Sequence, residues 1–374
     1  VIYYNPFSSQ RLWNRDIFGS ATWRHTMPSQ LGLLVNVKYA QNHLRYLDPD
    51  VLNSAGKLDQ QYDQREFFSS MAVTYPIGRS LGLSLAGDLV VNDLRTDHAG
   101  FAFPTRYTGL FVFSAKAKLG GFKVHGDLLN TNIYEKVKIG SAAPSRVVWS
   151  PAFSVSFTPR NSPFMIRGFY KQIFTNPTFN DLYYTRIGNR NLEPEFATQY
   201  DLGLTFSNSG SFSATADVYY NQVRDKIIAI PNKDLFTWTM LNLGEVDIRG
   251  LDVGIKYENT FYEQLVGSLS VNYTLQNAVD ITDPLSGTYL HQIPYTPRNT
   301  AAYNVGFKKS GFGLFYNQII TGGRYYLGQN LPENYVRGFS LSDLTATYEN
   351  SRASIPYSLS ATVNNIFNAP YAFI

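Results

Sequence analysis

Alternation of apolar and polar residues with a period of two is the feature that most constrains the fold of this chain. In Phe212–Asn221, one set of alternate residues is Phe, Ala, Ala, Val and Tyr, while the other is Ser, Thr, Asp, Tyr and Asn. Tyr357–Asn365 repeats this pattern. Because successive side chains of a β-strand point to opposite faces, both segments are predicted to be strands with one apolar and one polar face.

The same alternation recurs along the chain. The further segments that carry it are 33–41, 81–91, 111–119, 153–157, 164–170, 251–258 and 265–276. We expect roughly fifteen or sixteen strands, many of about ten residues, which is the length that crosses a bilayer at a tilt. Tight turns such as 120–121 and 207–210 alternate with long polar loops such as 42–65, a pattern typical of an outer-membrane barrel.

The composition also favours many strands joined by turns. The chain has 27 Tyr, 26 Phe and 28 Gly residues, whereas only 16% of its residues are charged, so aromatic-rich surfaces are expected rather than a soluble helical enzyme. No linker divides the 374 residues, which indicates one architecture from end to end. Aromatic residues near strand ends are expected in the girdle at the membrane interface. Examples are Tyr219, Tyr220, Tyr273 and Tyr316.

Several classes of protein are excluded by what the sequence lacks. It contains no Cys, which removes disulfides, thiolate metal sites and cysteine nucleophiles together. The net charge of +4 is small and scattered, so no nucleic-acid partner is expected. No run of about 18 apolar residues could form a transmembrane helix. A soluble propeller or lectin sandwich stays open as an alternative, although the fixed repeat of a propeller is absent.

Two adjoining motifs precede the strand predicted after Glu195. The loop motif has the spacing aromatic-x-x-Pro-x-Phe-x-x-Leu-Tyr and consists of Phe174, Pro177, Phe179, Leu182 and Tyr183. The box that follows consists of Asn189, Asn191, Leu192, Glu193, Pro194 and Glu195, with Arg190 between the two asparagines. Both motifs resemble segments of the barrel of TonB-dependent outer-membrane receptors, which usually have Pro at the position of Arg190.

Three later segments resemble the same family in the expected order. Arg249 and Gly250 lie in an Arg-Gly-Leu-Asp strand start, and Pro294 and Pro297 lie in an Ile-Pro-x-x-Pro segment. Near the end of the chain, Asn365 and Phe367 belong to a segment that is similar to the penultimate Asn-Leu-Phe-Asp motif. The loop and box together with these three segments, in the expected order, make the resemblance specific for the second half of the chain.

The resemblance implies an all-β fold, an antiparallel transmembrane β-barrel of about 22 strands when complete. Residues 1–374 are then a partial barrel domain in the bacterial outer membrane, and the N-terminal plug domain, the first strands and the last strand are expected outside this sequence. The implied partners are the TonB complex, which acts through the plug, a small-molecule ligand and outer-membrane lipid. A surface lipoprotein is a further candidate partner.

Ligand binding is expected on long loops, because aromatic side chains give a large contact area and Arg binds carboxylate or phosphate in a bidentate manner. On the first loop the candidates are Phe179, Asn180, Asp181, Tyr183, Tyr184, Arg186 and Asn189. On two later loops they are Tyr289, His291, Arg324, Tyr325 and Tyr326. The alternative for each of them is that it only packs the loops together. For Glu193 and Glu195, a structural role at the rim is expected.

Enzymatic chemistry finds little support in the sequence. None of the five His residues stands in a metal-binding spacing. The pattern Gly78-Arg79-Ser80-Leu81-Gly82 runs into the strand predicted at 81–91 rather than into a helix, so it is not a nucleophile elbow. We therefore expect no catalytic residue, no metal site and no cofactor. An outer-membrane barrel enzyme and a passive porin or adhesin stay open as alternatives of another class.

The expected activity is TonB-dependent active transport of a scarce, bulky nutrient. The loop motif and the box are most similar to those of cobalamin and haem receptors. The haem branch usually places a His between these motifs, and none lies between Pro177 and Asn191. Cobalamin or a related corrinoid, or a ferric chelate, is therefore the expected substrate, with haem or a ferric siderophore as the alternative.

Overall fold

The computed structural model describes residues 9–50, 56–184, 188–208, 210–231, 238–261, 264–351 and 355–371. Within these residues, sixteen strands form one sheet in which each strand pairs with the next of the sixteen along the chain. The strand pairs whose register lies in the described residues are all antiparallel. Among the described residues, no helix is long and apolar enough to cross a membrane. The chain is thus all-β, as the alternation predicts.

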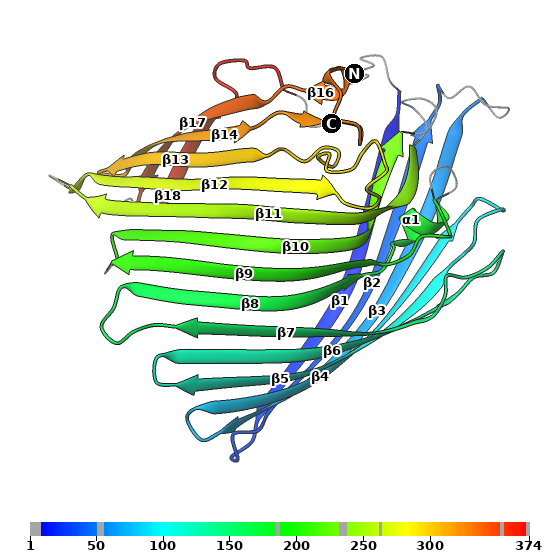
Figure 1. Ribbon diagram of the computed structural model, residues 1–374, viewed down its shortest axis with the longest axis horizontal. Helices are drawn as coiled ribbons and strands as arrows, with labels where there is room; N and C mark the ends of the chain where they lie inside the picture. Colours follow the sequence, from blue (N-terminus) through cyan, green and yellow to red (C-terminus); the bar gives the residue numbers. More distant parts are fainter. Residues whose placement is uncertain are drawn as a thin grey trace. The chain divides into compact units, whose positions relative to one another are not determined.

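The chain divides into two compact units. Unit 1 comprises Val1–Ser154, Lys171–Phe196 and Asp225–Asn242, and unit 2 comprises Val155–Tyr170, Ala197–Arg224 and Leu243–Ile374. The first six strands, which lie in unit 1, are β1 (Arg11–Thr26), β2 (Gly32–Asp48), β3 (Leu58–Ile77), β4 (Leu81–Thr96), β5 (Thr105–Leu119) and β6 (Phe122–Lys136). Figure 1 shows these six strands in blue to cyan.

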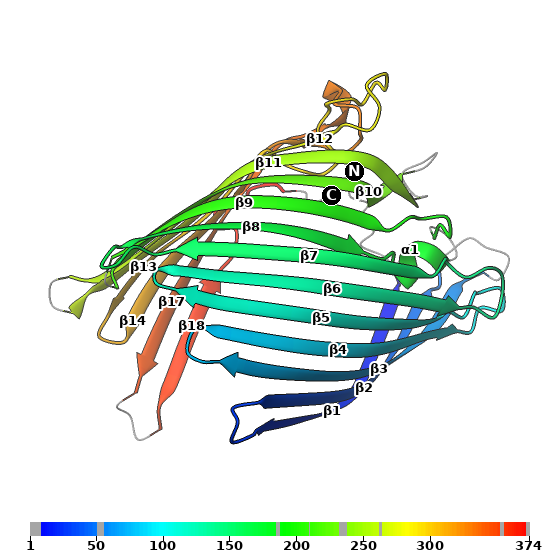
Figure 2. The same cartoon turned by 60° about the horizontal axis from the view of Figure 1, so that its bottom comes forward.

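Five strands contribute residues to both units. They are β7 (Arg146–Phe157), β8 (Phe164–Thr175), β9 (Glu195–Asn208), β10 (Phe212–Pro231) and β11 (Trp238–Thr260). The remaining strands, all in unit 2, are β12 (Val266–Asp280), β13 (Asn299–Lys309), β14 (Phe312–Thr321), β17 (Phe339–Asn350) and β18 (Tyr357–Val363). Figure 2 shows β14, β17 and β18 running side by side. A second, two-stranded sheet joins β15 (Arg324–Tyr325) to β16 (Tyr335–Val336).

One face of the unit 1 sheet is apolar and the other is polar. On β5, Phe111 and Phe113 are exposed on the apolar face, and Phe111 is 59% exposed. Ser114, the next residue after Phe113, donates a hydrogen bond to Asp127 of β6 on the opposite, polar face. Lys38 and Glu66 form an ion pair of 3.1 Å on the same polar face. The alternation along each strand therefore separates lipid-compatible from hydrated side chains.

The sequence prediction of a long polar loop at 42–65 is wrong. β2 continues to Asp48 and β3 begins at Leu58, with Asn42 opposite Gln64 in the ladder. Alternation fades in this part of the two strands because both faces carry polar residues, while the backbone hydrogen bonds continue. A pattern that relies on an apolar face cannot detect such a strand.

Unit 2 separates its side chains in the same way. Val218 of β10 is exposed on the apolar face, whereas the neighbouring Asp217 forms an ion pair of 2.6 Å with Arg167. Tyr219 lies on the face of Asp217, so its expected place in the interfacial girdle is wrong. A side chain added at Gly250 of β11 would meet the Tyr219 ring at 2.1 Å. The glycine of the Arg-Gly-Leu-Asp motif is thus required by the close approach of this ring.

Candidate functional site

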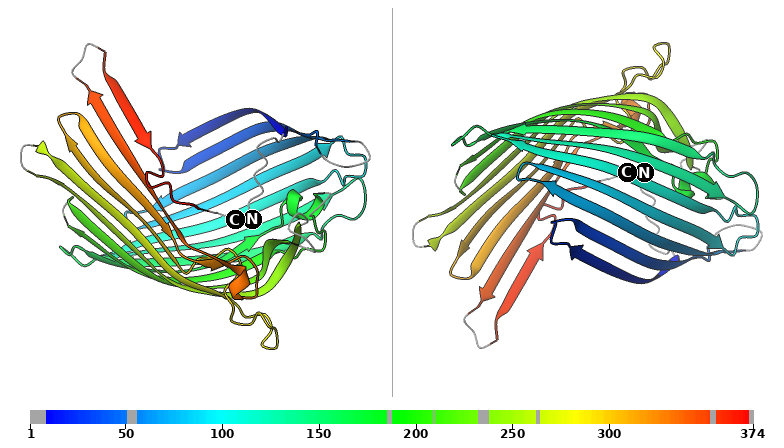
Figure 3. Two further views of the ribbon diagram at one scale, coloured as in Figure 1. Left: turned by 90° about the horizontal axis from the view of Figure 1, so that it is seen from above. Right: turned by 90° about the horizontal axis from the view of Figure 1, so that it is seen from below.

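A folded loop of unit 1 lies against the polar face of its sheet. The loop contains α1 (Phe179–Tyr183), and Figures 1 and 3 show this short helix on one side of the strands β1 to β6. Thr178 caps the helix: its hydroxyl accepts from the backbone N–H of Asp181, and the Asp181 carboxylate accepts from the Thr178 N–H at 2.7 Å. This capping box fixes where the helix begins.

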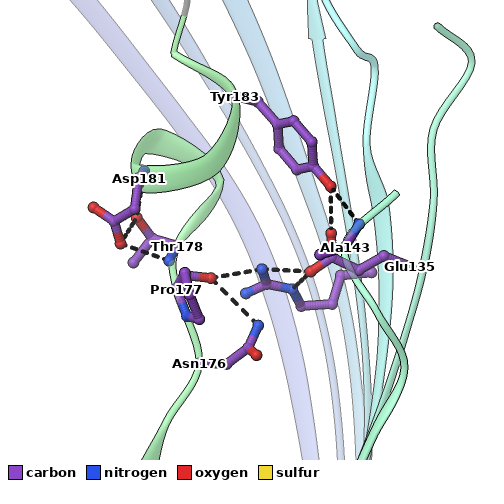
Figure 4. Close-up of polar contacts among 8 residues, drawn as sticks. Glu135, Ala143, Asn176, Pro177, Thr178, Asp181 and Tyr183 are labelled. Carbon is purple, nitrogen blue, oxygen red and sulfur yellow. Dashed lines mark hydrogen bonds and ion pairs between the residues drawn. The ribbon is translucent and has the colours of Figure 1, made fainter. Parts of the chain in front are cut away.

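A buried ion pair holds this loop to the sheet. Arg106 of β5 binds Glu135 of β6 at 2.6 Å and also donates to the carbonyl oxygen of Pro177 at 2.6 Å. The Tyr183 hydroxyl donates to the other oxygen of Glu135 at 2.8 Å and accepts from the N–H of Ala143 at 3.3 Å. Figure 4 shows Tyr183 reaching Glu135 and the carbonyl oxygen of Pro177 facing the guanidinium group that binds Glu135. Burial, followed by the bond to Glu135, raises the pKa of Tyr183 to about 12.

The box at 189–195 links the loop to β11 and to the core. Leu192 and Pro194 are buried, Leu192 in a cluster with Leu182 and Tyr183. The N–H of Glu193 donates to the Asn242 side chain at 2.9 Å, and the Glu193 carboxylate binds Arg146 at 2.5 Å. Within the box and at its end, the N–H of Asn191 donates to the Asn189 side chain at 3.0 Å, and Glu195 accepts from the N–H of Ile227 at 3.2 Å.

A cavity of about 650 Å³ lies between α1 and the polar face of β1 to β5, within unit 1. Its apolar and aromatic lining consists of Leu12, Leu44, Tyr46, Leu58, Tyr62, Leu94, Phe179 and Tyr184. Its other lining residues are Asn42, Asp48, Gln60, Gln64, Asn92, Arg106, Thr178 and Asn180. A cavity of this size, walled by aromatic, leucine and amide side chains, suits a bulky ligand that accepts and donates hydrogen bonds.

The two charged residues of the cavity wall are already engaged. Arg106 binds Glu135 and lies over the Phe179 ring, with its guanidinium carbon 4.8 Å from the ring centre. Asp48 accepts from the Gln10 side chain at 2.8 Å and from the N–H of Asp50 at 3.0 Å. By contrast, the side-chain amides of Gln64 and Asn180 have no hydrogen-bond partner among the described residues. The wall therefore offers neutral groups to a ligand.

The candidate residues of the first loop fall into two groups. Phe179, Asn180 and Tyr184 line the cavity. Asp181, Tyr183 and Asn189 instead hold the loop: Asp181 completes the capping box, Tyr183 binds Glu135, and Asn189 donates to the carbonyl oxygen of Met240 at 3.1 Å. Arg186 lies outside the described residues.

The candidates of the two later loops lie in unit 2. The N–H of Asn330 donates to His291 at 3.3 Å, and the carbonyl oxygen of Tyr325 accepts from the N–H of Tyr295 at 2.7 Å. Arg324 is buried and lies over the Phe339 ring at 5.8 Å. The N–H of Tyr326 donates to Asn334. Tyr289 closes a turn by donating its N–H to Ser286. These contacts pack the loops of unit 2 together.

The strand residues of the cavity were missed by the sequence reasoning. Asn42, Gln60, Gln64 and Asn92 belong to β2, β3 and β4, and nothing in their local sequence distinguishes them from other polar-face positions. A signal was present in their spacing, because alternate Asn and Gln residues on adjacent strands point to one face. The described residues contain no group of three or more His, Asp or Glu side chains that could hold a metal ion.

The whole chain, rather than the cavity alone, decides its family. Residues 2–366 match the protein family described as "TonB dependent receptor-like, beta-barrel". The chain belongs to this family. The resemblance drawn from these motifs is thereby confirmed, and this receptor barrel domain belongs to the bacterial outer membrane.

Two relatives of the receptor are similar in sequence. The "Vitamin B12 transporter BtuB" of Vibrio vulnificus is 24% identical over 198 residues, which cover 53% of this chain and 29% of the relative. The protein of the same name from Photobacterium profundum is 25% identical over 186 residues, which cover 47% of this chain and 27% of the relative. The matched part thus spans less than a third of the length of these curated relatives.

Solved structures of the same architecture resemble the receptor over nearly its whole length. The "Copper transporter OprC" superposes with a TM-score of 0.76 at 15% identity, covering 94% of this chain and 59% of the other. The ferric citrate transporter FecA in its unliganded form gives a TM-score of 0.73 at 14% identity, with coverage of 96% and 57%. At such low identity, the similarity establishes the fold.

Proposed function

We propose that this chain is the barrel part of a TonB-dependent active transporter that imports cobalamin or a related corrinoid across the outer membrane. The single observation that supports this substrate best is the neutral, amide-rich cavity between α1 and the strands of unit 1. A corrinoid is bulky and carries several amide groups, so side-chain amides such as those of Gln64 and Asn180 can pair with it. The sequence similarity to the two vitamin B12 transporters supports the same substrate.

The alternative substrates fit this cavity less well. A ferric citrate or catecholate complex is anionic and requires free cations, yet the Arg106 guanidinium is already neutralised by Glu135. Haem iron is most commonly held by an axial His, and none of the lining residues is a His. The transport mechanism we propose is binding and gated release, without bond chemistry. Energy would come from the TonB complex acting through a plug domain.

The test is a binding titration on the intact receptor extracted from membranes. Cyanocobalamin should bind at least about tenfold more tightly than ferric citrate or a ferric catecholate. A tenfold preference corresponds to a difference of only about 1.4 kcal/mol in binding free energy. Tight binding of a ferric chelate with none of cyanocobalamin would replace the corrinoid by a siderophore-type substrate. Binding of none of these ligands, together with steady leakage of small solutes, would favour a passive porin.

Substitutions at the two unpaired amides sharpen this test. Gln64→Ala and Asn180→Ala should each weaken cyanocobalamin binding by roughly threefold to tenfold, the loss expected for one hydrogen bond. Gln41→Ala removes the same type of side chain from the apolar face of β2 and serves as the matched control. Equal affinity of all three variants would show that the ligand does not contact this cavity.

A further inference from the structure

A row of aromatic residues crosses the apolar face of unit 1. In the strand ladder, Tyr39, Phe67, Val91, Tyr107 and Tyr134 stand directly opposite one another on β2 to β6. The four aromatic side chains are exposed, and the Tyr107 and Tyr134 rings stack at 6.1 Å. Exposed Tyr and Phe in such a row mark the height of the membrane interface. We refer to these five residues as the aromatic row.

The apolar residues lie on one side of the aromatic row only. On β3, the face is apolar or small from Phe67 to Ile77, a span of 11 residues that is close to the length needed to cross a bilayer. On β4, the matching residues run from Leu81 to Val91. The opposite side of the aromatic row is therefore the side where lipid headgroups begin.

Charged residues follow immediately on that side. The next ladder row contains Gln41, Arg65, Asp93, Thr105 and Lys136, about 7 Å further along the strands. The row after it contains Arg15, His43, Asp63 and Arg95. Together these rows carry four permanent cations and two carboxylates. All six lie on the same face of the sheet as the aromatic row.

Three of these cations have no carboxylate partner. Asp93 pairs with Arg95 at 2.8 Å, and Asp63 pairs with His43 at 3.1 Å. Arg15, Arg65 and Lys136 form no ion pair among the described residues, and the Nε atom of Arg65 is buried without a hydrogen-bond acceptor. These three residues, which we call the cationic rim, remain available to an external anion at headgroup height.

We propose that the cationic rim binds the phosphate groups of membrane lipids at this interface. Arg and Lys make charge-assisted hydrogen bonds to phosphate oxygens, and the planar guanidinium does so in a bidentate manner. The aromatic row would contact the lipid on the apolar side of the rim, at the acyl chains and the sugar or glycerol backbone. The phosphate of the same lipid then lies opposite the rim. The receptor is thereby fixed in depth by phosphorylated lipids that surround it.

The test uses the intact receptor in phosphatidylcholine nanodiscs that contain either diphosphorylated lipid A or the same lipid without phosphate. Binding to the phosphorylated lipid should be stronger and should weaken when NaCl is raised from about 0.1 M to 0.5 M, because salt screens exposed charges. The triple variant R15Q/R65Q/K136Q should lower the affinity by on the order of 100-fold, about fivefold for each cation removed.

A matched triple variant controls for the change in net charge. Lys116, Lys118 and Lys123 are exposed on the polar face of β5 and β6, and their replacement by Gln also removes three positive charges. This control should bind the phosphorylated lipid within about twofold of the unmodified receptor, since lipid does not reach that face.

Three results would overturn the proposal. One is equal affinity of the unmodified receptor for the two lipids. Another is an equal loss of affinity in the control and rim variants. The third is full competition by inorganic phosphate at millimolar concentration, which would assign the rim to free phosphate. If R15Q/R65Q/K136Q does not assemble, the salt dependence and the lipid comparison on the unmodified receptor decide the question.

Discussion

At the scale of single residues, the hydroxyl group of Tyr183 links α1 to β6. It donates to Glu135, whose side chain is only 1% exposed and also carries the ion pair with Arg106. Replacing Tyr183 with Phe leaves one oxygen of a buried carboxylate without a partner, which should destabilise the loop by about 1–3 kcal/mol. Faster proteolytic cleavage of the 174–195 segment would report this change. Tyr184→Phe is the control, and cleavage of both variants at the same rate would contradict a role for the hydroxyl.

The ionisation of Tyr183 gives a second prediction for the same contact. Its folded-state pKa of about 12 lies above the ordinary value of 10.0, because burial and then Glu135 disfavour the phenolate. The resulting stabilisation, about 3 kcal/mol, is complete below pH 10 and is lost as the pH rises from 10 to 12. The difference in absorbance at 295 nm between the unmodified protein and Tyr183→Phe should titrate near pH 12. A midpoint near pH 10 would show that the phenol is not buried as described.

Gly250 gives a prediction in which an added methyl group, rather than a removed hydroxyl group, lowers the stability of the fold. A methyl group at this position would overlap the Tyr219 ring, so Gly250→Ala should destabilise unit 2 by about 1–3 kcal/mol. The double variant Gly250→Ala/Tyr219→Ala removes the overlap and should recover part of that loss. Thermal unfolding in detergent measures both. Gly19→Ala, where a methyl group meets nothing within 4 Å, should leave the unfolding temperature unchanged.

At the scale of strands, the two faces differ in what they tolerate. Leu359 of β18 is 62% exposed on the apolar face of unit 2, and Ser360 points to the opposite face. Leu359→Lys places a charge in lipid and should reduce stability by about 2–4 kcal/mol at mid-depth, whereas Ser360→Lys should be tolerated. The yield of folded protein in the outer membrane measures the difference. Equal yields would mean that the faces of β18 are assigned the wrong way round.

Alternation of apolar and polar residues predicts strands well where one face of the strand is apolar. It does not detect strands whose two faces are both polar. The segments Phe111–Leu119 and Leu81–Val91, predicted from their alternation, both lie within observed strands. The segment 42–65 is predicted as a loop because its polar residues occupy both faces. The cavity shows the same limit, since Phe179, Asn180 and Tyr184 stand out as loop residues while the lining residues of β2 and β3 do not. Their common position depends on the loop folding back over the sheet, which local sequence does not encode.

At the scale of the whole molecule, two kinds of recognition with different salt dependence are expected. The neutral corrinoid that we propose as substrate would make hydrogen bonds and apolar contacts in the cavity, so its dissociation constant should change by less than about twofold between 0.1 and 0.5 M NaCl. An anionic ferric chelate would lose affinity over the same range. Isothermal titration on the intact receptor distinguishes the two, and a strong salt effect on cyanocobalamin binding would contradict a neutral site.

The continuation of β2 and β3 beyond the aromatic row affects which surface antibodies and bacteriophages can bind. From Tyr39 to Asp48 and from Phe67 back to Leu58, each strand extends for about 30 Å past the aromatic row. These strand extensions form a rigid, hydrogen-bonded surface rather than a mobile loop. The same extensions carry Tyr46, Leu58 and Gln60 of the cavity lining, so an antibody or bacteriophage fibre that binds them would bind the strands that form the cavity wall.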